Sequence, residues 1–251
     1  MPLNIVVDIG NSRVKLGYFQ GGQLLAATAY AHADYPRAVL ASAPWQAYSG
    51  QSKYLGMASV GNPEMVKATD ILLAAQPGLR LQIISRETPL PIGNRYQTPQ
   101  TLGMDRICAA VAAFQRAGKG PVLVVNAGTA LTYDYVDANG DYLGGAISLG
   151  LRSRFRALHD YTAALPLLAH DGPLQWVGDT TETCIRSGLI HGITLEIEGF
   201  VARYSELGKE PLSVFLTGGD AEFLGNLLKS ITFVDSNLLL YGINTLIRDH
   251  V

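Results

Sequence analysis

The sequence predicts an α/β protein of two domains, each built on a mixed β-sheet, and two observations carry this prediction. A unit of short apolar runs separated by turn residues begins at residue 3 and begins again at residue 122. Each copy is followed by strand-like apolar runs that alternate with amphipathic segments of helical period. A chain of 251 residues has room for two domains, which we place at residues 1–118 and 119–251 with a cleft between them.

The repeated unit is an antiparallel meander of strands. Its first copy has apolar runs at 3–7 and 14–19, and its second has them at 122–125 and 131–136, with Gly-containing turns between the runs. The matching positions lie 118 residues apart: Asp8 and Asn126, Gly10 and Gly128, Gly22 and Gly140. Three corresponding features at one offset indicate an internal duplication.

The segments around the repeats supply the remaining elements. We expect helices at 35–46, 64–75, 105–117, 151–161, 222–229 and 238–247, and strands at 53–58, 81–85 and 212–216. A long helix should open at Asp179, with Glu182 completing a capping box. Its apolar residues recur every fourth position from Ile185 to Val201, which predicts one buried stripe.

Composition excludes several classes of protein. A net charge of −2 gives no electrostatic footprint for nucleic acid or an anionic membrane. The chain shows no apolar run of membrane-spanning length and no signal-peptide pattern, so we expect a cytoplasmic protein. Cys108 and Cys184 both fall in predicted helices, where we expect buried, reduced thiols. The histidines have no metal-ligand spacing.

The first glycine turn, DIGNSRVK, has the residues that phosphate binding needs. Asp8 ends a strand and can reach a magnesium ion directly or through water. Gly10 lets the backbone approach a phosphate closely, while Asn11 and Ser12 supply donors. Lys15 can neutralise a terminal phosphate. Taken alone, the turn is equally well explained as an ordinary hairpin whose polar residues satisfy turn hydrogen bonds.

Two later turns favour the functional interpretation. The segment NAGTALT, which begins at Asn126, repeats the first turn, and two such turns can hold and align a polyphosphate for phosphoryl transfer. The segment LTGGD carries Gly218 and Gly219 between a strand and a helix, where an adenine and its ribose can lie against the backbone. By itself a Gly-Gly turn is usually structural. No Walker or Rossmann motif occurs.

In this order the three turns resemble the phosphate and adenosine motifs of the acetate and sugar kinase, chaperone ATPase and actin superfamily. Residues 96–106 (YQTPQTLGMDR) look like the substrate segment of type III pantothenate kinases, with further matches at 144–147, 162–166 and 178–188. The resemblance covers residues 4–247. It implies two actin-like (ribonuclease H-like) domains, and an ATP-dependent transferase that phosphorylates the 4′-hydroxyl of pantothenate, the first step of coenzyme A biosynthesis.

The resemblance also implies roles for individual residues. Asp105 would be the general base and Arg106 would bind the pantothenate carboxylate, for which an arginine fork is suited. Without the resemblance, Asp105 is explained as a residue favoured at a helix start by the helix dipole, and Arg106 as a solvated side chain. Tyr96, Gly103 and Thr181 would complete the substrate site; Thr180 is an alternative to Thr181, and helix capping explains either. The implied ATP-binding residues are Asp8, Gly10, Asn11, Ser12, Arg13, Val14, Lys15, Gly128, Thr129, Gly218 and Gly219.

One position departs from the family pattern, which has Asp where this chain has Asn126. The implied metal ligands are Asp8 and Asn126, and an amide lacks the negative charge that favours a hard divalent cation. We therefore expect weakened metal handling. Two alternatives are a kinase of this fold acting on another small hydroxyl compound, such as a sugar, and a nucleotide-binding regulatory protein that has lost catalysis.

The family resemblance further implies Mg²⁺ with ATP, a monovalent cation (K⁺ or NH₄⁺) and a homodimer. Gly188 and Gly192 lie four residues apart on the predicted long helix and permit close helix packing. That packing would serve either a dimer contact or the interior of the chain.

Overall fold

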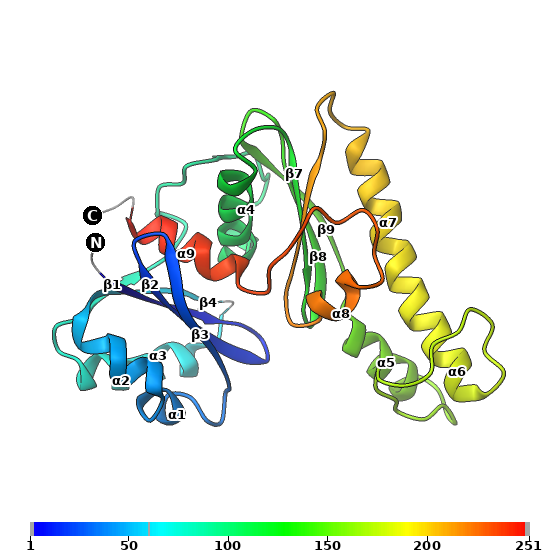
Figure 1. The fold of residues 1–251 in the computed structure, drawn as a ribbon, viewed down its shortest axis with the longest axis horizontal. Helices are drawn as coiled ribbons and strands as arrows, with labels where there is room; N and C mark the ends of the chain where they lie inside the picture. The colour runs from blue at the N-terminus through cyan, green and yellow to red at the C-terminus, as the bar shows by residue number, and fades with distance from the viewer. Residues whose placement is uncertain (1–2, 60, 249–251) are drawn as a thin grey trace. The chain divides into compact units, whose positions relative to one another are not determined.

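The computed structural model describes residues 3–59 and 61–248, and its contacts divide the chain into two units (Figure 1). One unit holds the described residues up to 116 together with those from 237 onward, and the other holds residues 117–236. Each unit has one mixed sheet with helices packed on it. The predicted α/β class with two mixed sheets is confirmed.

The sheet of the first unit has the strand order β3-β2-β1-β4-β5. Its meander is antiparallel, as predicted, and two further strands run parallel to β1. The strands are β1 (Leu3–Ile9), β2 (Arg13–Gln20), β3 (Gln23–Ala31), β4 (Ser52–Ser59) and β5 (Arg80–Ile83). Because β1 is the central strand and both of its faces are covered, it reads as a nearly continuous apolar run.

One face of this sheet is covered by α1 (Arg37–Leu40), α2 (Ala43–Tyr48) and α3 (Pro63–Ala75), with the 3₁₀ turn η1 (Ser49–Gln51) after α2. The single helix predicted at 35–46 is therefore two. Ser42 caps α2 by accepting a hydrogen bond from the Trp45 N–H at 3.3 Å, which ends the first helix and starts the second.

The other face is covered by α9 (Leu238–Arg248), on which α4 (Met104–Ala117) packs; β6 (Gly93–Asn94) and η2 (Pro99–Thr101) precede α4. This placement corrects the expected second domain of 119–251, since α9 belongs to the first unit. Its apolar side is buried on β1 and β4, and Asn244 donates to the Gly21 carbonyl at 2.8 Å.

The second unit repeats the strand pattern of the first. Within it the order is β11-β10-β7-β8-β9: the meander is antiparallel, and the later strands run parallel to β7. The strands are β7 (Val122–Ala127), β8 (Ala130–Val136), β9 (Asp141–Leu149), β10 (Ser213–Thr217) and β11 (Phe233–Val234). The predicted duplication is thus visible as two sheets with the same sequence of antiparallel and parallel pairings.

Its helices are α5 (Leu151–Asp160), α6 (Thr181–Arg186), α7 (Gly192–Ser205) and α8 (Ala221–Gly225), and a π-helical turn, Ser187–His191, joins α6 to α7. The predicted stripe is buried from Ile185 to Val201 except at Leu189, which is half-buried within the π turn. The extra residue of a π turn rotates the helix faces, so strict four-residue spacing does not hold there.

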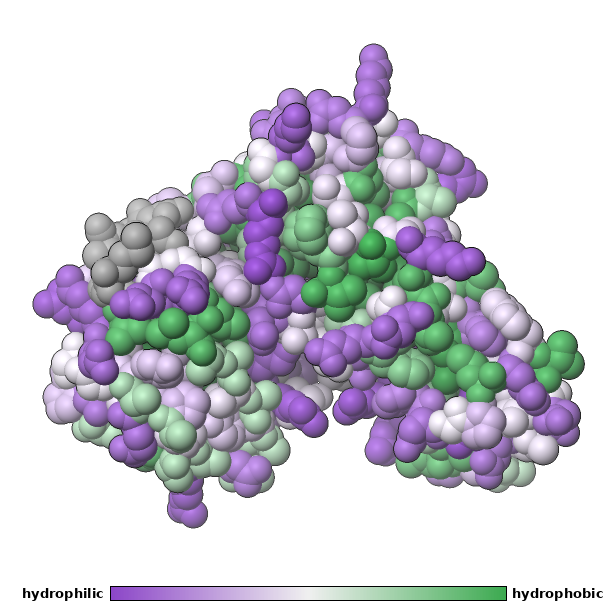
Figure 2. Space-filling view, viewed as in Figure 1, coloured by the Kyte–Doolittle hydropathy of each residue, from purple (hydrophilic) through white to green (hydrophobic). Residues whose placement is uncertain are grey.

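Apolar side chains are also exposed on the second unit, and Figure 2 shows apolar surface on the side where α7 lies. Trp176 and Val177 are 69% and 84% exposed. Cys108 is buried as expected, whereas Cys184 on α6 is exposed, which corrects the expectation of a buried thiol; both are free thiols. Among the described residues, no helix has the length and apolarity needed to cross a membrane.

Candidate active site

The β1–β2 hairpin places Asp8 directly opposite Lys15 in the antiparallel register. Paired residues of neighbouring strands project to the same face, so the carboxylate and the ammonium share one side of the sheet. The hairpin is closed by a hydrogen bond from the Gly10 N–H to the Arg13 carbonyl at 3.0 Å. Asn11, Ser12 and Arg13 are exposed at its tip, where a ligand can reach them.

Asp8 has an unusual electrostatic environment. Burial raises its pKa to about 7, the negative charge of Asp105 raises the pKa as well, and Lys15 opposes both. A carboxylate in this state is stabilised by a cation, and a hard divalent ion with oxygen ligands fits it. Among the described residues, no group of three or more His, Cys, Asp or Glu side chains is arranged so that it could hold a metal ion.

Asp105 lies in the first turn of α4, in the same unit as Asp8. Burial raises its pKa, while the Arg106 N–H and the Arg106 charge lower it. Gly103 leaves room for this carboxylate, because a Cβ there would lie 2.3 Å from Asp105 Oδ1. A carboxylate whose pKa is raised is a stronger base than an ordinary Asp.

The side chains expected at the substrate also gather in the first unit. Arg106 is buried to 7% exposure, and its guanidinium carbon lies 6.0 Å from the centre of the Tyr96 ring. Arg106 is therefore not the solvated side chain that the alternative explanation of the sequence required. The first unit thus brings Asp8, Lys15, Asp105, Arg106 and Tyr96 together in one region.

The second unit joins the other two glycine turns. β7 and β10 run in parallel with Asn126 beside Thr217, so their turns leave the sheet at the same edge. The Asp220 N–H donates to the Ala127 carbonyl at 3.0 Å. Gly218 has φ +99°, and a Cβ there would lie 2.4 Å from the Ala127 carbonyl oxygen and 2.6 Å from Asn126 Oδ1. Only glycine fits this contact.

The start of α5 packs against the turn at Gly128. The sequence predicted the turn but not this contact. A Cβ at Gly150 would lie 1.9 Å from the Gly128 carbonyl oxygen, and Ser153 Oγ donates to the Thr129 carbonyl at 2.7 Å. Arg152 pairs with Asp220 of the Gly-Gly turn at 3.3 Å. The sequence signal was a glycine just before a helix, which is too common to interpret alone.

Asp134 does not replace the missing carboxylate at position 126. It is fully buried in β8, where it accepts hydrogen bonds from the Tyr142 hydroxyl at 2.6 Å and from Thr132 Oγ1 at 3.1 Å. It lies two residues beyond Thr132, which is the residue paired with Asn126. Its carboxylate is committed to these hydroxyls inside the sheet.

Thr180 and Thr181 differ in their surroundings. Thr180 caps α6, accepting from the Thr183 N–H at 3.2 Å, while Thr183 Oγ1 accepts from the Thr180 N–H at 2.9 Å. The capping box is therefore formed by Thr180 and Thr183, and the predicted pair of Asp179 and Glu182 is wrong. Both Thr180 and Thr181 line a cavity of about 750 Å³.

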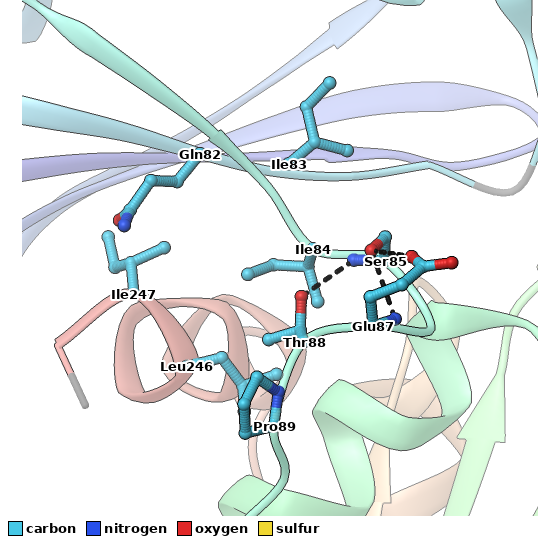
Figure 3. A pocket seen from close by; sticks show the side chains of 9 residues that line it. All are labelled: Gln82, Ile83, Ile84, Ser85, Glu87, Thr88, Pro89, Leu246 and Ile247. Carbon is cyan, nitrogen blue, oxygen red and sulfur yellow. Dashed lines mark hydrogen bonds between the residues drawn. The ribbon is translucent and has the colours of Figure 1, made fainter. Parts of the chain in front are cut away.

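A smaller cavity, of about 260 Å³, lies in the first unit between residues 82–89 and the end of α9 (Figure 3). Ile83, Ile84 and the α9 side chains give it a largely apolar wall, and Thr88 Oγ1 accepts from the Ser85 N–H at 3.0 Å. None of the predicted site residues lines this cavity, so we assign it no role in the reaction.

Solved structures share this architecture. The chain resembles a Campylobacter jejuni protein described as a Baf family transcriptional activator, with TM-score 0.61, 21% identity and 98% of each chain covered. It also resembles the inorganic polyphosphate/ATP-glucomannokinase of Arthrobacter sp. strain KM, with TM-score 0.52, 16% identity and full coverage of both chains. These likenesses show the fold alone, which is that of the actin-like sugar kinases.

Sequence comparison identifies the family within this class. The family model for type III pantothenate kinase matches residues 4–203. The type III pantothenate kinase of Flavobacterium johnsoniae is 38% identical over 243 residues, covering 96% of this chain and 95% of the relative. The chain belongs to the type III pantothenate kinase family and is a kinase.

Proposed function

We propose that this chain transfers the γ-phosphoryl group of ATP to the 4′-hydroxyl of pantothenate, the first step of coenzyme A biosynthesis. The observation that carries the proposal is the group of Asp8, Asp105 and Arg106 within one unit, with the two carboxylate pKa values raised by burial. A base, a phosphate turn and a carboxylate-binding arginine are the parts that this transfer needs.

The nucleotide is bound by the glycine turns. The first unit would contribute the N–H groups and side chains of residues 10–14 together with Lys15. The second unit would contribute Gly128 and Thr129 to the phosphates and the Gly218–Gly219 backbone to the adenosine. A magnesium ion bound with ATP supplies charge neutralisation at the phosphates, and Asp8 and Asn126 are its proposed protein ligands.

The acceptor is oriented by the start of α4 and the segment before it. Asp105 would take the proton of the attacking hydroxyl, since burial makes it a better base than an ordinary Asp. Arg106 would hold the carboxylate of pantothenate, with Tyr96 beside it and Gly103 leaving space for the Asp105 carboxylate. A sugar has no carboxylate, so the buried Arg106 favours an acidic acceptor.

Thr181 is the stronger candidate of the two adjacent threonines for substrate contact. The Thr180 hydroxyl is engaged in the capping box of α6, whereas Thr181 is exposed in the first turn of α6 and lines the cavity of about 750 Å³. The assignment of Thr181 therefore rests on the different commitments of the two hydroxyls.

Three finer features remain part of the proposal. We expect a monovalent cation, K⁺ or NH₄⁺, a cytoplasmic location and a homodimer. The space beyond Gly188 and Gly192 supports the dimer, because a Cβ at either position would meet nothing within 4 Å. That openness also argues against close packing inside the chain, which was the other interpretation of these glycines.

The test of the assigned base compares Asp105→Asn with the wild-type enzyme. The amide cannot accept the hydroxyl proton, so we expect kcat to fall at least about a hundredfold with little change in the Kd of ATP. Coupled ADP release measures kcat, and Asp70→Asn, an exposed carboxylate on α3, is the matched control. Near-normal turnover in Asp105→Asn would eliminate this base.

The same preparation separates the kinase from a nucleotide-binding regulatory protein. Measurable ATP binding without turnover, with pantothenate and potassium present, would favour a regulator. Neither the family model nor the curated relatives favour that alternative.

A further inference from the structure

α9 separates the sheet of the first unit from α4 (Figure 1). On its sheet side, Leu240 Cδ1 lies 3.2 Å from the Cβ position of Gly17 in β2. Ile247 and Ile243 approach the Cβ position of Gly56 in β4 to 2.7 and 3.2 Å. These glycines let the helix lie close against the strands beside β1, whose end carries Asp8.

The opposite side of α9 contacts α4. Thr245 Oγ1 donates to Gln115 Oε1 at 3.0 Å, and the Arg116 guanidinium lies 4.1 Å from the centre of the Tyr241 ring. The closest contact is at Gly242, where a Cβ would lie only 1.8 Å from the Cys108 carbonyl oxygen and 2.4 Å from its carbonyl carbon.

Helix geometry agrees with this arrangement. At about 100° per residue, the side chains that face the sheet and those that face α4 fall on opposite sides of α9. The helix is therefore a spacer, and its thickness at Gly242 sets how near α4 approaches the sheet. The atoms that a Cβ at Gly242 would meet belong to the backbone of Cys108, so no flexible side chain there can move aside to make room.

The contact lies close to the reacting groups. Cys108 is one helical turn beyond Asp105, and its thiol is buried next to the carboxylates of Asp8 and Asp105, whose charges add to the effect of burial in raising its pKa. A shift of α4 at Cys108 is thus carried to Asp105 and changes its position relative to Asp8.

We propose that Gly242 is a positioning residue for phosphoryl transfer: by omitting a side chain, it lets α4 hold Asp105 at its working distance from the phosphate turn at Asp8. The inference rests on the proposed function, since it takes Asp105 as the base. Gly242 lies more than 130 positions from Asp105 in the sequence and approaches α4 at the backbone of Cys108.

The test is Gly242→Ala, assayed by ADP release and by thermal unfolding. The added methyl group must move α4 away from α9, and a misplacement of about 1 Å can cost about a hundredfold in rate. We expect kcat to fall at least about tenfold, with the KM values of ATP and pantothenate within about twofold of wild type. The kcat is normalised to the folded fraction that thermal unfolding gives at the assay temperature, because unfolded protein lowers the apparent kcat without changing KM.

Gly56→Ala is the matched control, because its methyl group meets only the ends of isoleucine side chains on the sheet side of α9. We expect its kcat to stay near wild type even where its melting temperature falls. Wild-type kcat in folded Gly242→Ala, or an equal loss in Gly56→Ala, would overturn the proposal.

If Gly242→Ala does not fold, the double variant Gly242→Ala/Ile247→Val tests whether the spacing between α4 and the sheet is what matters. Removing a methyl group from the sheet side lets α9 sink toward β4, so folded protein with much of the kcat restored supports the spacing role. A double variant that stays unfolded, or folds with no kcat restored, contradicts it. Loss of pantothenate-dependent ADP release in the wild type would instead refute the proposed function.

Discussion

Asp8 and Asp105 lie close enough for the charge of one to raise the pKa of the other. Such a pair favours a bound cation and disfavours the empty, fully ionised protein. Residues that serve a site in this way reduce stability when no ligand is present. The loss of stability caused by Asp8 can be measured, because its pKa is about 7 and thermal unfolding can be followed on both sides of that pH.

Proton binding by Asp8 determines how its contribution to stability changes with pH. Between the ordinary Asp pKa of 3.8 and about 7, folded Asp8 keeps a proton that the unfolded chain has lost, so its contribution to stability declines as the pH rises. We expect Asp8→Asn to melt about 2–4 °C above wild type near pH 8 without magnesium. The difference should close near pH 4, where Asp8 is protonated in both states. Equal melting temperatures near pH 8 would contradict this account, with Asp70→Asn as the control.

Asn126 is the other residue with a defined test. Its Oδ1 lies against the backbone of Gly218, so a carboxylate there would add charge at the junction of two glycine turns. We expect Asn126→Asp to lower the magnesium concentration for half-maximal ADP release by several-fold, because a carboxylate favours a hard divalent cation. An unchanged magnesium titration with an unchanged rate would refute weakened metal handling in the natural chain.

The residue-scale chemistry was predictable where it depends on local spacing. Asp8 and Lys15 are both in the first turn, and a hairpin of that length places them opposite each other. The exposure of Cys184 was not predictable, because helical periodicity alone did not indicate which side of α6 is covered. The raised pKa of Asp8 depends on Asp105, which is distant in the sequence.

At the scale of elements, the start of α6 shows why cap positions are hard to predict. The segment DTTET offers several residues that can cap a helix with similar preference. The structure selects Thr180 and Thr183, which exchange hydrogen bonds. A helix start that depends on which of several hydroxyls forms the cap is hard to predict from sequence. The existence of the helix was predicted correctly, because a long buried stripe supports it.

This cap also separates the two threonines experimentally. Thr180→Ala should lose about 1 kcal/mol of stability by removing the cap, while Thr181→Ala should leave the melting temperature unchanged and raise the KM of pantothenate several-fold. Thermal unfolding and steady-state kinetics of both variants measure this. The opposite assignment, with Thr180 alone affecting KM, would place substrate contact at the capping residue.

At the scale of the molecule, the offset of 118 residues predicted two sheets of like topology, and they are found. The same pattern could not place α9, because an amphipathic helix carries no mark of the sheet that it covers. Gly17 and Gly56 are the complementary surface for α9, but a glycine inside a strand has many explanations. The assignment of the last helix therefore required the structure.

The central claim is that this chain phosphorylates pantothenate with ATP. It is tested most directly by measuring ADP release from the wild-type protein with magnesium and potassium, with and without pantothenate, and by determining the mass of the product. We predict ADP release that requires pantothenate, with one phosphoryl group gained by pantothenate for each ADP formed. ATP binding with no pantothenate-dependent ADP release would contradict the account.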